Sequence, residues 1–349
     1  MVATEVKMKK LFVVALAMLL ALSLFAQGSS ESSSTKKVED TLDVYSIMPE
    51  KYATQVFEQF TKDTGIKVNF VRLSSGEALS RLIAEKDNPQ VDCLWGGPSD
   101  TYDAGIKEGI FAQYEPKEAS AIPLNYQSPD HYWTGIGLIP LCILTNTDFL
   151  KKNNLEAPQS WYDLLNPAYA NGLQMADART SGTATERIYA MVLGLGEDEA
   201  FRVQKEMNKN VQLYTKSGAG GALPIANGQA ASGIFYLVDA LDIVLQGYPL
   251  VISYPKEGVT YGVEGSGIVN GCKHPEAAKA LMDWASSKAL GELMMANNIC
   301  YVPTRPDVAV TLDALDMSKI PLIESSSAWK GENRARFVEK WENEVISNN

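Results

Sequence analysis

The sequence predicts an α/β protein of two lobes, each a mixed sheet flanked by helices, joined by two hinge crossings of the chain. Strand-like runs alternate with helical patterns along its length, which is typical of mostly parallel sheets flanked by helices. The chain of 349 residues also exceeds the size at which one hydrophobic core usually stops growing. Two long extended runs, one in the middle and one near the end, can carry the chain between two cores.

The first 26 residues have the pattern of a secretory signal peptide. Three lysines precede an apolar run over residues 11–22, which is shorter than the roughly 20 apolar residues of a membrane span. We expect cleavage near Ala26 and export to the periplasm. Lipid anchoring is the alternative, but Gln27 stands where a lipidated cysteine would be needed. Residues 27–37 are rich in Gly and Ser and predict a flexible leader.

The body of the chain divides into four segments. Residues 38–138 are expected to form the first part of lobe one, 139–261 lobe two, and 262–308 the return to lobe one. Residues 309–349 predict C-terminal helices that pack on lobe two. The crossings are placed within Gly135–Leu141 and Tyr261–Ile268.

Charge and cysteine content limit the partners and cofactors. The net charge of -11 becomes more negative when the lysine-rich signal peptide is removed, which argues against nucleic acid and anionic membranes. Cys93 and Cys142 lie in apolar strand-like runs and predict free core thiols, whereas Cys272 and Cys300 could be free or bonded. No CxxC motif or Cys/His cluster exists, so we expect no metal and no cofactor.

Three glycine-containing loops could offer backbone N–H groups to an oxygen-rich ligand. The first, residues 96–100 (GGPSD), follows a strand-like run; Gly97 and Ser99 are its candidates, although Ser99 could simply cap a helix. The third, residues 216–222 (KSGAGGA), offers Gly218 but fits a flexible turn equally well.

The second loop, residues 177–187 (DARTSGTATER), is the strongest candidate. It joins a strand-like run to a helix, and a helix start binds anions through free N–H groups and its partial positive charge. Ser181 and Thr183 add hydroxyls, and Gly182 permits close approach. Arg179 could add a bidentate contact to a phosphate or carboxylate, unless it is an ordinary surface arginine.

Single residues at expected interlobe positions complete the candidate set, with packing or solvation as the alternative for each. These residues are Tyr45, Ser46, Ser75, Glu77, Tyr236, Asp239 and Glu264. Among them, the carboxylates of Asp239 and Glu264 could accept hydrogen bonds from the hydroxyls of a sugar or polyol.

Catalysis finds little support in the sequence. Its two histidines lack a nucleophile at recognisable spacing, and no Walker-type loop, HExxH or GxSxG motif is present. We therefore predict a protein that is not an enzyme, with an exported phosphohydrolase as the distant alternative.

Four stretches resemble a bacterial solute-binding family that includes binders of ferric ion, thiamine, phosphonates and hexose phosphates. They are AEKDNPQVDCLWGGPSDTYDAGIKEGIFAQY, SWYDLLNPAYANGLQMADARTSGTA, GYPLVISYPKEGVTYGVEGSGIVNG and HPEAAKALMDWASSKALGEL. The resemblance implies a periplasmic-binding-protein fold of cluster II type and ligand capture in an interlobe cleft. It also implies hinge closure by a monomer, and delivery to an ABC permease with its ATPase.

The resemblance leaves two ligand classes open. Ferric members use adjacent tyrosines at a position that here most nearly corresponds to Phe235 and Tyr236, so one phenolate is missing; Tyr45, Glu77 and Tyr236 remain the possible iron ligands.

Phosphorylated-solute members resemble this chain in the SGT, YPKEG and VEG segments. That likeness implies phosphate binding by residues 181–183, with Asp239 and Glu264 reading the rest of the solute. We expect a phosphate-bearing or otherwise anionic organic solute, with ferric iron as the alternative.

Overall fold

The computed structural model describes residues 39–347. The predicted signal peptide and leader lie outside these residues. Within them, no helix is both long and apolar enough to cross a membrane.

Ten strands form one continuous hydrogen-bonded system with the order β2-β1-β3-β10-β5-β8-β6-β7, while β4 pairs with β10 and β9 with β5. Lobe one contains β1 (Thr41–Ser46), β2 (Lys67–Arg72), β3 (Cys93–Pro98), β4 (Phe111–Ala112) and β10 (Tyr261–Val269). Lobe two contains β6 (Leu173–Ala176), β7 (Val211–Thr215), β8 (Ser232–Tyr236) and β9 (Leu250–Ser253), and β5 (Thr134–Asn146) belongs to both lobes. Both lobes mix parallel and antiparallel pairs, which confirms the predicted fold class.

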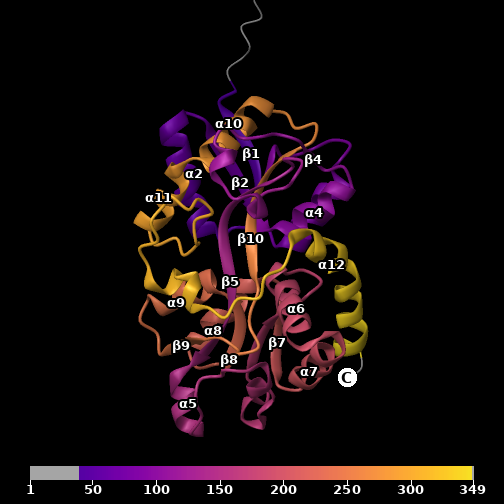
Figure 1. Cartoon of the computed structure of the whole chain (residues 1–349), viewed down its shortest axis with the longest axis vertical. Coiled ribbons are helices and arrows are strands. Elements are labelled where there is room, and N and C mark those ends of the chain that lie inside the picture. Colours follow the sequence, from indigo (N-terminus) through magenta and orange to yellow (C-terminus); the bar gives the residue numbers. More distant parts are fainter. Residues whose placement is uncertain (1–38, 348–349) are drawn as a thin grey trace, which may run out of the picture. The chain divides into compact units, whose positions relative to one another are not determined.

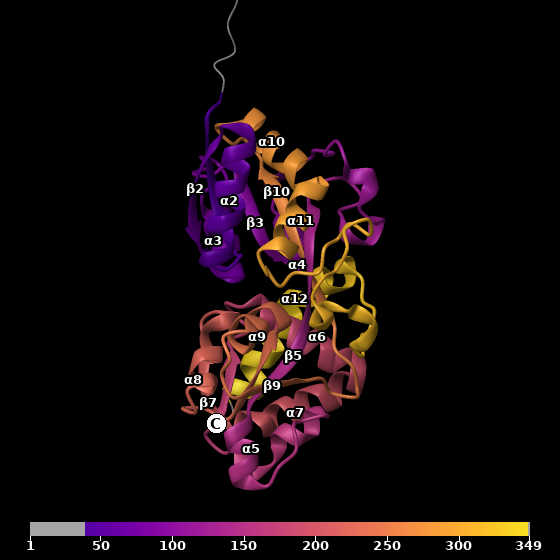
Figure 2. The same cartoon turned by 90° about the vertical axis from the view of Figure 1, so that its left-hand side faces the viewer.

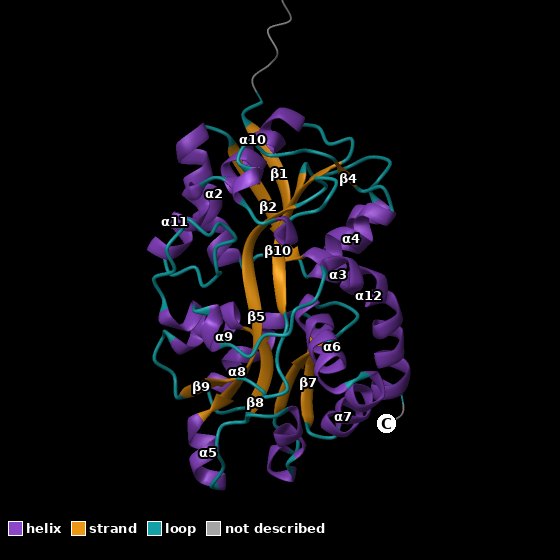
Figure 3. Ribbon diagram, viewed as in Figure 1, coloured by secondary structure: helices purple, strands orange, loops and turns teal. Residues whose placement is uncertain are grey.

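Helices flank the strands in each lobe (Figure 3). Lobe one carries α2 (Glu50–Thr64), α3 (Ser75–Ala84), α4 (Ser99–Lys107), α10 (Pro275–Ser286) and α11 (Lys288–Ala296). Lobe two carries α5 (Thr147–Asn153), α6 (Gly182–Leu195), α7 (Glu197–Asn208), α8 (Ala222–Ala226) and α9 (Leu237–Val244). The helices α10 and α11 are separate because Ser287 is extended and its side chain caps α11 by accepting the Ala289 N–H.

The strand β5 passes from one lobe to the other within one residue. Pro140 pairs with Tyr261 of β10, and the next residue, Leu141, pairs with Tyr236 of β8. Figures 1 and 2 show β5 running between the two lobes, with β10 beside it in lobe one. β10 itself has an irregularity between Glu264 and Gly265, where its pairing with β5 shifts.

The C-terminal segment ends in α12 (Ser327–Trp341), which packs against α4 of lobe one and α6 of lobe two (Figure 1). A small apolar cluster lies beneath it. Phe337 and Trp341 of α12 join Tyr189 and Phe201 there, separately from the main core.

All four cysteines are free. The alternative of a Cys272–Cys300 bond is therefore wrong. Cys272 lies beside Asp92, whereas Cys300 lies beside Asp242, so the two thiols occupy different surroundings.

Truncating the cluster beneath α12 tests how much it stabilises the fold. Trp341 is fully buried and stacks edge-on against Tyr214 at 5.3 Å. We expect Trp341→Ala to lower the free energy of unfolding by about 3–5 kcal/mol, because the cavity cannot fully collapse. Leu124→Ala, at a side chain that is 84% exposed, should change it by less than about 0.5 kcal/mol. Urea unfolding measures both, and equal effects would contradict this assignment.

Candidate functional site

A cavity lies between the lobes at the carboxyl ends of the parallel strands. It is lined on lobe one by Ile47, Pro49, Arg72, Ser74, Ser75, Pro98, Glu264 and Tyr301, and elsewhere by Ile139, Ser181, Gly182, Thr183, Ser217, Gly218, Ala219, Tyr236, Val238 and Asp239. The strands β1, β2, β3, β6, β7 and β8 each lead into a loop or helix start that contributes to this lining. Ligands of open α/β sheets bind at such edges.

The helix α6 points its first turn into this cavity. Ser181 precedes the helix in extended conformation, Gly182 is its first residue, and both line the cavity with Thr183. The first N–H groups of a 14-residue helix have no acceptor within the helix, and they carry its partial positive charge. This helix start can therefore bind an anion.

Two glycines allow the close packing around the helix start. A Cβ on Gly182 would lie 2.6 Å from Pro98 Cγ and 2.9 Å from Ser75 Oγ, both in lobe one. A Cβ on Gly218 would lie 2.0 Å from Thr183 Oγ1. Any larger residue at position 182 would keep the lobes apart.

Arg72 is the cation of the cavity, and it was not among the residues predicted from the sequence. It is the last residue of β2 and is half-buried in the lining. Among residues 39–347, no hydrogen bond or ion pair to its guanidinium is found. Its position at a strand end, two residues before Ser74, was the signal that could have identified it.

Two carboxyl groups face the same cavity. Glu264 is 3% exposed, and its Oε2 accepts the Gly97 N–H at 2.6 Å. Burial raises the pKa of Glu264 to about 8, against the lowering effect of the Gly97 N–H and Arg72. Burial likewise raises the pKa of Asp239 to about 7, which Arg72 partly offsets. The carboxyl group of Asp239 makes no hydrogen bond to any other described residue.

The first glycine loop, residues 96–100, contacts the site through Gly97, which binds Glu264. Gly97 belongs to β3 with φ +81°, and its N–H is occupied by Glu264. Ser99 begins α4, and its hydroxyl meets that of Ser327 at 2.8 Å, so the capping alternative is wrong because Pro98 is the N-cap. Ser46 is buried against Met48 O. Of this loop, only Pro98 lines the cavity.

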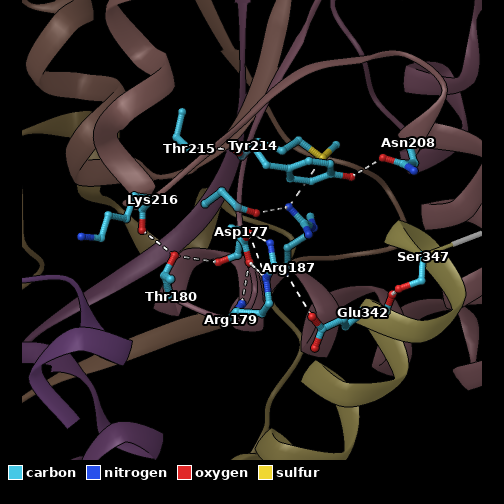
Figure 4. A network of polar contacts seen from close by, with 12 residues as sticks. Asp177, Arg179, Thr180, Arg187, Asn208, Tyr214, Thr215, Lys216, Glu342 and Ser347 are labelled. Carbon is cyan, nitrogen blue, oxygen red and sulfur yellow. Dashed lines mark hydrogen bonds and ion pairs between the residues drawn. The ribbon is translucent and has the colours of Figure 1, made fainter. Parts of the chain in front are cut away.

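Arg179 points away from the cavity, so its placement does not support the expected anion contact. Its guanidinium pairs with Asp177 at 2.5 Å and with Glu342 at 3.1 Å (Figure 4). Asp177 lies only two residues earlier and accepts the Arg179 N–H as well, which closes a local ring. The side chain is 47% exposed.

The three possible iron ligands are not brought together. The Tyr45 hydroxyl donates to Glu85, at 2.9 and 3.0 Å to its two oxygens, outside the cavity lining. Glu77 accepts the N–H and hydroxyl of Ser74 and pairs with Lys216, which lowers the pKa of Glu77 to about 2. Tyr236 alone lines the cavity, and its hydroxyl donates to Gly182 O at 3.3 Å.

Direct contacts join the lobes around the cavity. The Gly76 N–H donates to Thr180 O at 3.0 Å, and Glu77 pairs with Lys216. Asp242 accepts from Lys51 at 2.6 Å and from Tyr52 at 3.0 Å. The structure therefore has its lobes closed on the site.

The fold and the site together define a two-lobed binding protein. Residues 99–324 match the family described as bacterial extracellular solute-binding protein, and the chain belongs to this family. The predicted class of solute-binding protein is confirmed.

Relatives and solved structures agree with this assignment. An uncharacterized protein of Haemophilus influenzae is 31% identical, covering 93% of this chain and 95% of that protein. A putative 2-aminoethylphosphonate-binding periplasmic protein of Salmonella typhimurium is 32% identical over 51% of this chain and 49% of its own length. The Fe(3+)-binding periplasmic protein of Serratia marcescens is 24% identical, covering 80% of this chain and 82% of that protein.

A solved structure shows the same fold over nearly its whole length. The periplasmic binding protein AfuA from Actinobacillus pleuropneumoniae, with fructose-6-phosphate bound, has a TM-score of 0.84 and 29% identity. The match covers 88% of this chain and 99% of that one. The relatives from Salmonella, Serratia and Actinobacillus are all described as binding proteins.

The buried carboxyl group of Glu264 predicts a pH dependence of stability. Because its pKa rises from 4.5 to about 8 on folding, the folded state holds a proton that the unfolded state releases between these values. The free energy of unfolding of the ligand-free protein should therefore fall as pH rises from about 4.5 to 8, by at most about 1.4 kcal/mol per pH unit from this group.

Urea unfolding at several pH values checks this dependence. Glu264→Gln should flatten the decline, whereas Glu58→Gln on the exposed face of α2 should leave it unchanged. A decline equally steep in Glu264→Gln would contradict the assignment.

Proposed function

We propose that this protein is the extracytoplasmic receptor of an ABC importer. It binds a phosphate-bearing or other anionic small organic solute in the interlobe cavity and delivers it to a membrane permease driven by an ATPase. The observation that supports this most is the pairing of an unpartnered cation and a helix start with two carboxyl groups around one cavity.

The anionic part of the solute fits the side of the cavity formed by Arg72 and α6. A guanidinium offers several N–H donors in a geometry that matches phosphate or carboxylate oxygens. The N–H groups of the α6 start and the hydroxyls of Ser75 and Thr183 add neutral donors. Such a set binds an oxyanion without a metal.

The uncharged part of the solute fits the side formed by Asp239 and Glu264. Carboxyl groups at this position accept hydrogen bonds from hydroxyl groups, or pair with an ammonium group. Fructose-6-phosphate, bound in the AfuA structure, and 2-aminoethylphosphonate, in the name of the Salmonella relative, each carry a phosphoryl or phosphonyl group beside hydroxyls or an amine, which supports the proposal.

Ferric iron is the less favoured ligand. A hard cation needs several anionic oxygens, and only Tyr236 of the three expected ligands lines the cavity. Burial raises the pKa of Tyr236 well above its usual value, which disfavours the phenolate that iron requires. The positive charge of Arg72 in the same cavity also opposes a cation.

We further propose that the protein binds its solute without turnover. The cavity lining contains neither His nor Cys, and the one cluster of metal-binding residue types in the described chain, Asp43, Asp92 and His274, is absent from that lining. The predicted signal peptide and the periplasmic names of the relatives support export to the periplasm, where a monomer would act.

Thermal unfolding with candidate solutes tests the ligand class. A solute at a hundredfold excess over its dissociation constant stabilises the native state by about 2.7 kcal/mol. We expect fructose 6-phosphate or 2-aminoethylphosphonate to raise the melting temperature, and ferric citrate to leave it unchanged. A rise with the ferric salt alone would contradict the proposal.

Two arginine variants locate the anion site. Arg72→Met should weaken binding of the active solute at least tenfold in calorimetric titration, because it removes the charge beside the solute. The matched variant Arg179→Met removes a guanidinium that is already paired with Asp177 and should leave affinity within twofold. The reverse order of effects would move the site to Arg179.

A glycine variant tests binding in the closed cleft. Gly182→Ala places a Cβ 2.6 Å from Pro98 Cγ of lobe one, so the lobes cannot close fully around the solute. We expect at least a tenfold loss of affinity, while each lobe keeps its own core and the circular dichroism spectrum stays the same. Unchanged affinity would show that binding does not need this closure.

A further inference from the structure

A cluster of buried polar groups joins the two lobes through α12, outside the cavity. Its centre is Asp100, the second residue of α4 in lobe one, whose side chain is 1% exposed. Asp100 Oδ2 accepts the Tyr189 hydroxyl of α6 at 2.9 Å and is paired with Arg334 of α12. Lobe one thus presents a carboxylate whose partners come from lobe two and the C-terminal helix.

The apolar face of α12 belongs to lobe two. Phe337 and Trp341 share their cluster with Ala184, Tyr189 and Phe201, and no residue of lobe one takes part. Polar contacts strengthen this attachment. Lys330 pairs with Glu186 of α6 at 2.5 Å, a pair that is almost fully buried.

A neighbouring face of α12 meets α4 of lobe one. The hydroxyls of Ser327 and Ser99 lie 2.8 Å apart, and Lys107 Nζ donates to Gly331 O at 3.3 Å. Gly331 packs so closely that a Cβ there would lie 2.9 Å from Asp103 Cβ. The helix α12 is therefore attached to lobe two by its apolar side chains and contacts lobe one through polar groups.

The contact of α12 with α4 and α6 is next to the cavity, because both of these helices begin at its lining. α4 follows Pro98, and α6 begins at Gly182; both residues line the cavity and are in contact range of each other. Asp100 and Tyr189 connect the same two helices further along. Separating α4 from α6 would leave the buried carboxylate of Asp100 without the Tyr189 hydroxyl. The free-energy cost of losing such a partner opposes opening of the lobes.

We propose that Tyr189, Asp100 and Arg334 form an interlobe clamp that holds the lobes closed and positions the α6 start against lobe one. Tyr189 is then a positioning residue: it does not line the cavity, and it acts through the spacing of two helices. The hydroxyl of Tyr189 contributes to closure before any solute binds.

The Gly76 amide reports lobe closure independently of any ligand. It is the second residue of α3, so its N–H has no acceptor within the helix, and its partner is Thr180 O of lobe two at 3.0 Å. Hydrogen exchange at this amide follows the breaking of an interlobe bond. Gly76 is not a contact of Tyr189.

Amide exchange in the ligand-free mature protein tests the clamp. Tyr189→Phe removes only the hydroxyl, and we expect exchange at Gly76 to become at least fivefold faster while amides of β1 keep their rates. The control Tyr162→Phe removes a hydroxyl that donates to Glu199 at 2.7 Å within lobe two, and it should leave Gly76 unchanged. Equal Gly76 rates in wild type and Tyr189→Phe would overturn the proposal.

Solute affinity gives a second readout, which rests on the proposed function. Tyr189→Phe should weaken fructose 6-phosphate binding about fivefold, and Tyr162→Phe should not. If the wild-type protein fails to bind this probe, the proposed ligand class is contradicted, and the exchange rates still decide on the clamp. If Tyr189→Phe does not fold, Asp100→Asn replaces it, with the same acceleration at Gly76 expected and the same absence of change overturning the clamp.

Discussion

The arrangement of the site depends on one strand, β5, that belongs to both lobes. Its partner changes from β10 at Pro140 to β8 at Leu141. Proline has no N–H to donate, so it suits a position where one ladder ends and another begins. Because the strand is continuous, the carboxyl ends of the parallel strands in both lobes face one gap. Six strand ends therefore supply most of the cavity lining.

Charge within this gap determines what it can bind. No residue of the described part of the chain forms a hydrogen bond or ion pair with Arg72, and the carboxyl groups of Asp239 and Glu264 have raised pKa values because little water reaches them. A solute with an oxyanion at one end and hydroxyls or an amine at the other would supply partners for both kinds of group. Burying these polar groups without such partners costs free energy. Closure around a solute that supplies the partners is therefore more favourable than closure of the empty cavity.

The helical and strand elements could be predicted from local patterns, as could the place of residues 181–183 at a helix start that lines the cavity. Apolar periodicity predicted the β-α order, and a Ser-Gly-Thr sequence predicted the helix start at Gly182. Arg72 was not predicted because it is the last residue of β2 and lies outside the three glycine-containing loops. Arg179 was favoured because it lies in the right loop, yet Asp177 two residues away binds its guanidinium. Whether Arg179 binds a solute or Asp177 depends on the conformation of its side chain, which the sequence does not give.

The sequence by itself determined the two-lobed α/β class, the glycine positions and the candidate helix start, since these follow from periodicity and from backbone limits that act over a few residues. Only the tertiary structure decided which side chains share the cavity. Tyr45 and Arg72 both lie near the ends of neighbouring parallel strands, but Tyr45 is held by Glu85 while Arg72 faces the cavity. Contacts between residues far apart in the chain, such as Glu264 with Gly97, require the fold to bring them together.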